Sequence, residues 1–361
     1  MKRPAAWDWR TLTMLFALAL IWLVFSAATH GMFLSPRNLS LLARQMSVTS
    51  VLATGMVLVI VAGQIDLSVG AMSGLLGALA AIAATQMGWP LPLAFAAAIA
   101  LGAMLGGAQG ALVAGLGIPP FIVTLGGMLL DQGALLGITR GITITPPPAF
   151  LLAGQTYLPA RAGLALGGAL ALVFAWQAIR ARGATRVRFA GLALLAPAFV
   201  LLMNAYEGVP VPVLILALLA SLLALTAERT PFGRHLYAVG GNREAAFYSG
   251  IPIAKRLIGV FMLMGALCGV AGIVLTARVG AATTDAGRMM ELDAIAAAVI
   301  GGTSLMGGRG SVWGALLGAL VMASLDNGMS LLDTEAFWQP ILKGAILVAA
   351  VAADMAGRRR D

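Results

Sequence analysis

Long apolar runs separated by short polar loops are the feature that most constrains how this chain can fold. Twelve such runs lie at about residues 11–28, 48–63, 67–87, 93–115, 119–138, 163–179, 189–205, 212–227, 257–277, 291–306, 312–331 and 337–355. A helix needs roughly 20 apolar residues to cross a bilayer, and lipid tolerates only elements whose backbone polar groups are all paired. We therefore expect an all-α polytopic membrane protein with ten to twelve transmembrane or re-entrant helices, built as a single transmembrane domain over residues 1–361.

The charge content supports this class and excludes another. Only 10% of the residues are charged and 60% are hydrophobic, whereas a water-soluble domain carries roughly 25% charged residues. The formal net charge of +9 could indicate nucleic-acid binding. The cations, however, lie in the loops and termini between apolar runs, as the positive-inside rule expects for a membrane protein. No nucleic-acid partner is expected.

The sequence offers no constellation for catalysis. It has one cysteine, two histidines and three lysines, and no lysine ends a G-x-x-x-x-G-K-[ST] phosphate-binding loop. An intramembrane enzyme would need a nucleophile with its base, or a metal cluster. We therefore predict no catalytic residue, no metal site and no cofactor, and any ATP that drives this protein must be hydrolysed by another subunit.

A polar connector at 228–256 separates two apolar runs and contains a short helix signal. Asn242 is a good N-cap and Glu244 falls in the first turn, where its charge suits the helix dipole. Gly250 and Pro252 end the helix. Five cations accompany it: Arg229, Arg234, Arg243, Lys255 and Arg256. The pattern favours a capped helix on the cytoplasmic side that docks to another protein, although an ordinary polar loop is the alternative.

The distribution of arginines predicts the sidedness. The turn at 180–188 holds four arginines and is expected to be cytoplasmic, whereas 205–211 has no cation and is expected outside. If each apolar run crosses the bilayer once, the number of runs between these loops and each end of the chain puts both termini in the cytoplasm. The first run also has features of a signal peptide, but its length favours a first helix. The polar stretch 30–47 is expected to be an external loop.

Six polar residues within apolar surroundings are candidates for the substrate path: Gln64, Asp66, Glu291, Asp293, Asp326 and Asn327. Placing such residues in lipid costs free energy, so each needs a protein partner, water or a ligand. Each has a structural alternative. Asp66 could cap the next helix, 291–306 could be a re-entrant packing element, and the 326–327 pair could hold two helices together. Together with Asp131, Asp66 and Asp326 could also serve a proton relay, which makes a proton-coupled secondary sugar transporter the rival class.

Several motifs resemble those of one transporter family. The connector segment G-G-N-R-E-A-A-F-Y-S-G-I resembles the coupling loop of permease subunits of bacterial ABC sugar importers. Q-I-D-L-S-V-G, P-F-I-V-T-L, and the run E-L-D-A-I-A-A-A-V-I-G-G-T-S-L-M-G-G-R-G-S resemble further signatures of that family, and M-A-S-L-D-N-G-M-S is similar to its D-xylose branch. Two positions depart from the pattern. Gln64 stands where the family has Glu, and Asp131-Gln132 stands where it has Arg before Gly133.

This resemblance implies a function. The chain would be the permease subunit of an importer for a pentose, D-xylose, in the bacterial inner membrane. Its partners would be a cytoplasmic ABC ATPase, a periplasmic sugar-binding protein, a second copy of the chain, and membrane lipid. The ATPase-coupling residues would be Gly241, Asn242, Glu244, Ala245, Ala246 and Gly250.

Overall fold

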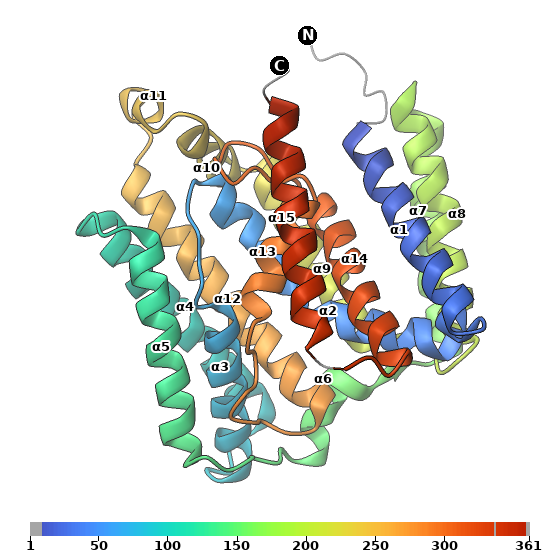
Figure 1. The fold of residues 1–361 in the computed structure, drawn as a ribbon, viewed down its shortest axis with the longest axis horizontal. Coiled ribbons are helices and arrows are strands. Elements are labelled where there is room, and N and C mark those ends of the chain that lie inside the picture. The colour runs from blue at the N-terminus through green and yellow to red at the C-terminus, as the bar shows by residue number, and fades with distance from the viewer. Residues whose placement is uncertain (1–8, 336, 359–361) are drawn as a thin grey trace.

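The computed structural model describes residues 9–335 and 337–358, and it is almost entirely helical, as Figure 1 shows. The α-helices are α1 (Trp9–Ala28), α2 (Pro36–Val61), α3 (Val69–Thr85), α4 (Leu91–Gly115), α5 (Pro120–Thr139), α6 (Leu152–Gln155), α7 (Ala160–Arg180), α8 (Ala184–Asn204), α9 (Val211–Arg229), α10 (Pro231–Gly241), α11 (Arg243–Tyr248), α12 (Ile253–Val279), α13 (Met290–Ile300), α14 (Val312–Leu331) and α15 (Trp338–Arg358). Two 3-10 helices, η1 (Met32–Leu34) and η2 (Pro148–Leu151), and two short strands, β1 (Tyr157–Leu158) and β2 (Val209–Pro210), complete the fold. The all-α polytopic class is confirmed.

Each of the twelve expected apolar runs falls on a helix. Within the described residues, eight helices are long and apolar enough to cross a bilayer, while α1 and α3 have shorter apolar stretches. The run expected at 291–306 forms helix only over Met290–Ile300, after which the chain turns. Glycines at 301, 302, 307 and 308 follow this helix, and three of them adopt positive φ, which glycine tolerates and other residues rarely adopt.

Helix α2 begins earlier than expected, within the stretch 30–47 that we expected to be an external loop. Ser35 caps it by accepting a hydrogen bond from Asn38 N at 3.3 Å, and Pro36 occupies the first turn, where a missing N–H costs nothing. Several of its polar side chains are paired to protein. The Ser47 hydroxyl donates to Ala43 O at 2.7 Å, and an Arg44 N–H donates to Tyr157 Oη at 2.9 Å. Polar residues satisfied in this way can lie in a helix at the centre of the bundle.

Glycines set the closest helix contacts. A Cβ placed on Gly102 of α4 would collide with the carbonyl of Gly265 in α12, and the reverse is also true. Gly77 of α3 and Gly272 of α12 meet in the same way, since a Cβ on Gly77 would collide with the Gly272 carbonyl. Lipid gives helices little hydrophobic reason to associate, so close approach through small residues supplies the attraction. Helix α12 is thereby held against both α3 and α4.

Helices α3 and α13 are too short to span, and their N-terminal ends meet inside the bundle. Figure 1 shows the chain descending from α2 before α3 begins at mid-height, and α13 lies at a similar level. A Cβ on Gly70, at the start of α3, would collide with the Gly287 carbonyl just before α13. Broken helices whose ends meet at depth are typical of transporter binding regions.

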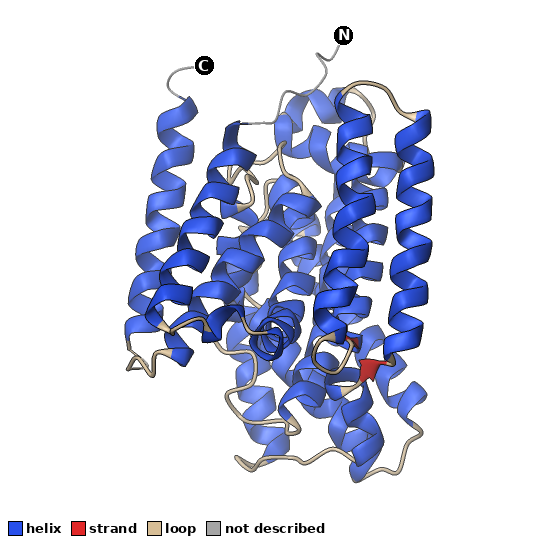
Figure 2. Cartoon of the chain, turned by 90° about the vertical axis from the view of Figure 1, so that its right-hand side faces the viewer, coloured by secondary structure: helices blue, strands red, loops and turns tan. Residues whose placement is uncertain are grey.

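The bundle has two ends. We call the end that carries α10 and α11 the loop face. The first residues of α1, the last residues of α15 and the turn between α7 and α8 lie at this same end (Figures 1 and 2). The opposite end carries β1 and β2, which pair antiparallel with Tyr157 opposite Pro210. The terminal cations Lys2, Arg3, Arg359 and Arg360 lie outside the described residues.

Candidate functional site

The connector 228–256 forms the exposed part of the loop face. Helix α11 has the expected cap, since Asn242 Oδ1 accepts a hydrogen bond from Ala245 N at 2.9 Å. Glu244 lies in its first turn, Ala246 is buried, and Gly250 takes a positive φ of 77° just after the helix. Two aromatic side chains on α11 remain exposed, Phe247 by 67% and Tyr248 by 78%. These two rings give α11 an exposed apolar surface.

A surface groove of about 700 Å³ runs beside α11. Its walls come from α11, the segment leading into α12, and the end of α4: Ala114, Arg243, Glu244, Phe247, Tyr248, Ile251, Pro252, Ile253, Ala254 and Lys255. The lining combines charges of both signs, on Arg243, Glu244 and Lys255, with mostly apolar side chains. This composition suits a protein partner with a mixed surface.

The sequence reasoning missed α10, although a start signal is present. Thr230 caps this helix by accepting a hydrogen bond from Gly233 N at 3.2 Å, and Pro231 occupies its first turn. Gly240, near its end, touches the carbonyl of Val61 at the end of α2 so closely that a Cβ would collide with it. Gly308 N also donates to Val61 O at 2.9 Å. The end of α10, the end of α2 and the loop after α13 therefore meet at one point.

Tyr237 adds a second tie between α10 and that loop. Its hydroxyl donates to Gly310 O at 2.9 Å. Burial, and secondly the carboxylate of Glu228, raise the pKa of Tyr237 above its ordinary value, so the phenol keeps the proton that it donates. Helix α10 is thus in direct contact with the end of α2 and with the loop that follows α13.

The start of α3 carries a buried polar cluster. Asp66 is 2% exposed, and one of its oxygens accepts hydrogen bonds from Ser68 N at 2.9 Å and from the Ser68 hydroxyl at 2.7 Å. That hydroxyl also lies 3.1 Å from Gln109 Oε1 of α4. Gln64 is buried nearby in the chain and donates to Ala62 O at 3.3 Å. Asp66 thus orders the turn before α3 but does not cap the helix, because both of its hydrogen bonds come from Ser68, which is itself the N-cap residue.

Glu291, in the first turn of α13, lies against this same region. A Cβ on Gly70 would collide with its carboxylate, which places Glu291 beside the first turn of α3. The structure therefore brings the two acidic motifs, I-D-L-S and L-D-A-I, to neighbouring helix starts. Asp131 of α5 is also buried, and its Oδ2 has no hydrogen-bond partner among the described residues.

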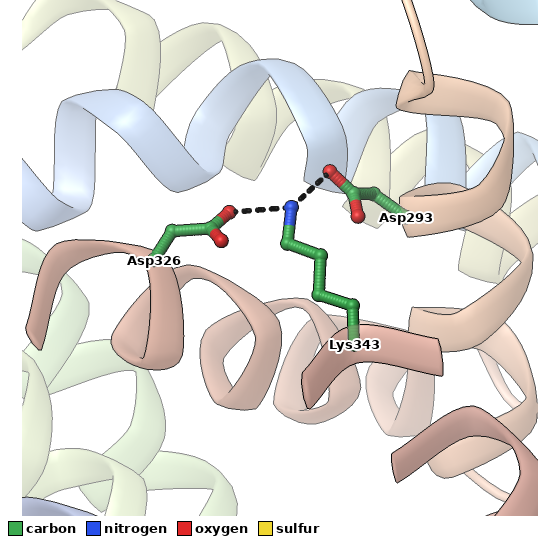
Figure 3. Close-up of polar contacts among 3 residues, drawn as sticks. All are labelled: Asp293, Asp326 and Lys343. Atoms are coloured by element: carbon green, nitrogen blue, oxygen red, sulfur yellow. Dashed lines mark hydrogen bonds and ion pairs between the residues drawn. The ribbon is translucent and has the colours of Figure 1, made fainter. Parts of the chain in front are cut away.

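Asp293 and Asp326 lie elsewhere, in an ion triad that Figure 3 shows. Lys343 Nζ is 2.9 Å from Asp293 Oδ2 and 2.9 Å from Asp326 Oδ2, and the three side chains are only 15–21% exposed. They come from α13, α14 and α15, so one lysine holds three helices. A cavity of about 310 Å³ borders Asp293 and Lys343. Lys343 was not among the sequence candidates, because nothing in the local sequence indicates which carboxylates it faces.

The side chain of Asn327 does not join the ion triad of Asp326, its neighbour in the sequence. It forms a reciprocal amide pair with Asn38 of α2: Asn38 Nδ2 donates to Asn327 Oδ1 at 2.8 Å, and Asn327 Nδ2 donates to Asn38 Oδ1 at 3.0 Å. Both side chains are buried. Of the six path candidates, Asp66 and Glu291 lie beside the starts of α3 and α13, and Gln64 lies in the loop before α3. The other three, Asp293, Asp326 and Asn327, make contacts that hold α14 to other helices.

Comparison with known proteins agrees with this architecture. Residues 38–351 match the family model described as "Branched-chain amino acid transport system / permease component". The xylose transport system permease protein of Escherichia coli (strain K12) is 48% identical, over 96% of this chain and 92% of its own length. Its counterpart in Haemophilus influenzae is 46% identical over 96% of each chain, and the ribose import permease protein of E. coli is 35% identical over 97% of this chain and 94% of its own. No solved structure matches this chain.

These matches cover nearly the whole chain and concern transport subunits, not enzymes. They also do not favour the secondary transporter that the buried carboxylates left open. The chain belongs to the family of membrane permease subunits of ABC importers that carry sugars.

Proposed function

We propose that this chain is the permease through which a bacterium imports a pentose, D-xylose, across its inner membrane. The observation that carries the proposal is the difference in identity: 48% and 46% to two xylose permeases, against 35% to a ribose permease, over similar lengths of chain. The family implies a cytoplasmic ATPase and a periplasmic binding protein as partners. A second copy of the chain and surrounding lipid complete the proposed assembly.

The proposed coupling path begins at α11. Its residues Gly241, Asn242, Glu244, Ala245, Ala246 and Gly250 would form the element that enters a groove on the ATPase, with Phe247 and Tyr248 as its apolar anchors. Because α10 touches the ends of α2 and of the 301–311 loop through Gly240 and Tyr237, movement of the ATPases would reach the centre of the bundle. In this mechanism ATP binding draws the coupling helices together and the spans rock to alternate access.

The proposed sugar path passes the α3–α13 junction. Gln64, Asp66 and Glu291 supply acceptors and donors at two helix starts, and irregular backbone at depth is tolerated only beside protein or water. These three side chains are buried here, so we expect the path at this junction to be closed in this conformation. Asp293, Asp326 and Asn327 would instead hold the helices that border the path.

The proposed sidedness follows the cations. The α7–α8 turn carries four arginines and shares the loop face with α11 and with the described ends of α1 and α15. Positive loops favour the cytoplasm. The loop face, both termini included, is therefore proposed to be cytoplasmic, and β1 and β2 to lie on the periplasmic side.

Removing the α11 anchors should uncouple the permease from its ATPase. In the variant Phe247→Ala/Tyr248→Ala, we expect normal insertion and melting temperature, because both rings are mostly exposed. Each anchor at a protein interface contributes about 2 kcal/mol or more, so co-purification of the ATPase and ATP-driven uptake should both be lost.

The matched control is Ile142→Ala, which removes an exposed apolar side chain, 61% exposed, from the loop after α5 at the other end of the bundle. It should leave ATPase binding intact. Full ATPase binding by the Phe247/Tyr248 variant would show that α11 is not the docking element.

A further inference from the structure

We propose that the arginine-rich end of the α7–α8 hairpin is a binding site for the phosphate headgroups of anionic phospholipids. The site consists of Arg180, Arg182, Arg186 and Arg188, which we call the arginine end. It lies on the loop face, at the top of the hairpin in Figures 1 and 2. The proposal does not depend on which sugar is transported.

The arginine end is a patch of uncompensated positive charge. All four side chains are exposed, and among the described residues none of them forms an ion pair with a carboxylate. No Asp or Glu occurs between residues 160 and 206. Four guanidinium groups within nine residues therefore have no carboxylate partner among the described residues.

The hairpin carrying this patch has the least buried of the eight apolar helices that are long enough to cross a bilayer. The apolar windows of α7 and α8 are 17% and 11% buried, whereas that of α2 is 78% buried. Helix α7 packs on α8 at Gly167, where a Cβ would lie 3.0 Å from Val200. The other faces of the hairpin expose large apolar side chains, such as Leu172 by 73% and Leu194 by 73%. Lipid tails are the environment that such a surface requires.

The apolar surface continues to the arginine end, which fixes the depth of the cations. Ile179, directly before Arg180, is 78% exposed, and Val187, between Arg186 and Arg188, is 61% exposed. Trp176 lies one turn before Arg180, and the Arg180 guanidinium is 3.8 Å from the centre of its ring. Tryptophan gathers at the boundary between hydrocarbon and headgroups. The guanidinium groups therefore lie at the level of the headgroups rather than in bulk water.

At the depth of the headgroups, the guanidinium groups are better matched to a lipid phosphate than to an acidic protein surface. A guanidinium presents a planar fork of N–H donors that matches two phosphate oxygens, and it stays charged at any physiological pH. A basic residue next to an anionic leaflet gains about 1 kcal/mol, which corresponds to roughly fivefold in affinity per residue. Because exposed apolar side chains flank the cations, a lipid fits with its tails along the hairpin and its headgroup on the arginines.

Tryptophan quenching by brominated lipids tests the proposal. The full chain is reconstituted into vesicles of brominated phosphatidylglycerol mixed with unlabelled phosphatidylcholine, and into the converse mixture. The signal of Trp176 is the difference between the unaltered chain and Trp176→Phe. We expect brominated phosphatidylglycerol to quench Trp176 more strongly, and Arg182→Gln/Arg186→Gln/Arg188→Gln, which keeps Arg180 beside Trp176, to reduce that preference by more than tenfold.

Two further variants make the test specific. Arg161→Gln removes an exposed arginine from the opposite end of the same hairpin and should leave the preference unchanged. The variant Arg182→Lys/Arg186→Lys/Arg188→Lys keeps the charge and should retain most of the preference for phosphatidylglycerol. It still tests the proposal if the glutamine variant does not insert into the membrane. Equal quenching by the two lipids in the unaltered chain would overturn the proposal. So would a preference that survives loss of charge, or arginines that prove necessary for ATPase binding but not for lipid preference.

Discussion

Replacing Lys343 with methionine should destabilise this protein more than any other single change that we propose. Two carboxylates, Asp293 and Asp326, would remain mostly buried without the cation that lies 2.9 Å from each. Removing one partner of a buried ion pair costs about 3–5 kcal/mol, since the remaining charge is uncompensated. Thermal unfolding of the detergent-solubilised protein would record the loss, and separation of α15 from α13 and α14 would accompany it.

Restoring charge balance should restore stability. The combined variant Asp293→Asn/Asp326→Asn/Lys343→Met removes all three charges, so that no uncompensated charge is left among these helices. We expect most of the lost stability to return. A Lys343→Met protein that melts with the unaltered chain would mean that the triad does not hold these helices, and the two carboxylates would return as path candidates.

The Asn327→Leu variant should lose stability and transport together. The change removes both amide hydrogen bonds to Asn38, and a buried polar group left without its partner costs about 1–3 kcal/mol. The Asn38 side chain would keep its hydrogen bond to Phe33 O at 2.8 Å. Melting temperature and uptake, measured on the same preparations, should fall in parallel.

A double-mutant cycle isolates this contact. If the pair joins α2 to α14, Asn38→Leu and Asn327→Leu should show a coupling energy between about 0.5 and 3 kcal/mol, as residues in contact do. If Asn327 instead faces the sugar, uptake should fall while the melting temperature stays the same and the two changes add independently. That second outcome would contradict the assignment drawn from the amide geometry.

Local rules predicted the local features of this protein well. The cap at Asn242 and the stop at Gly250 define α11, because capping and positive φ depend on a few adjacent residues. The twelve apolar runs likewise appear as helices because bilayer length is a property of each run alone. The start of α10 was missed even though Thr230-Pro231 signals it, since a polar connector suggested an irregular loop.

Such local rules could not predict contacts between elements that are distant in the sequence. Asp326 and Asn327 are adjacent in sequence, yet they point to α15 and to α2, and only the packing of the bundle determines this. Asn38 lay in a stretch expected to be an external loop, so no partner for Asn327 could be named. The meeting of the starts of α3 and α13 was suggested only by a short echo between two motifs, which by itself could not establish proximity.

The most direct test of the central claim is the energy source of transport. The chain is reconstituted into liposomes with its ATPase inside and its periplasmic binding protein outside, and uptake of labelled D-xylose is measured. The account predicts uptake that requires ATP and the binding protein, resists an uncoupler, and is lost in the Phe247→Ala/Tyr248→Ala variant. Uptake that proceeds without ATP and collapses when an uncoupler dissipates the proton gradient would contradict it.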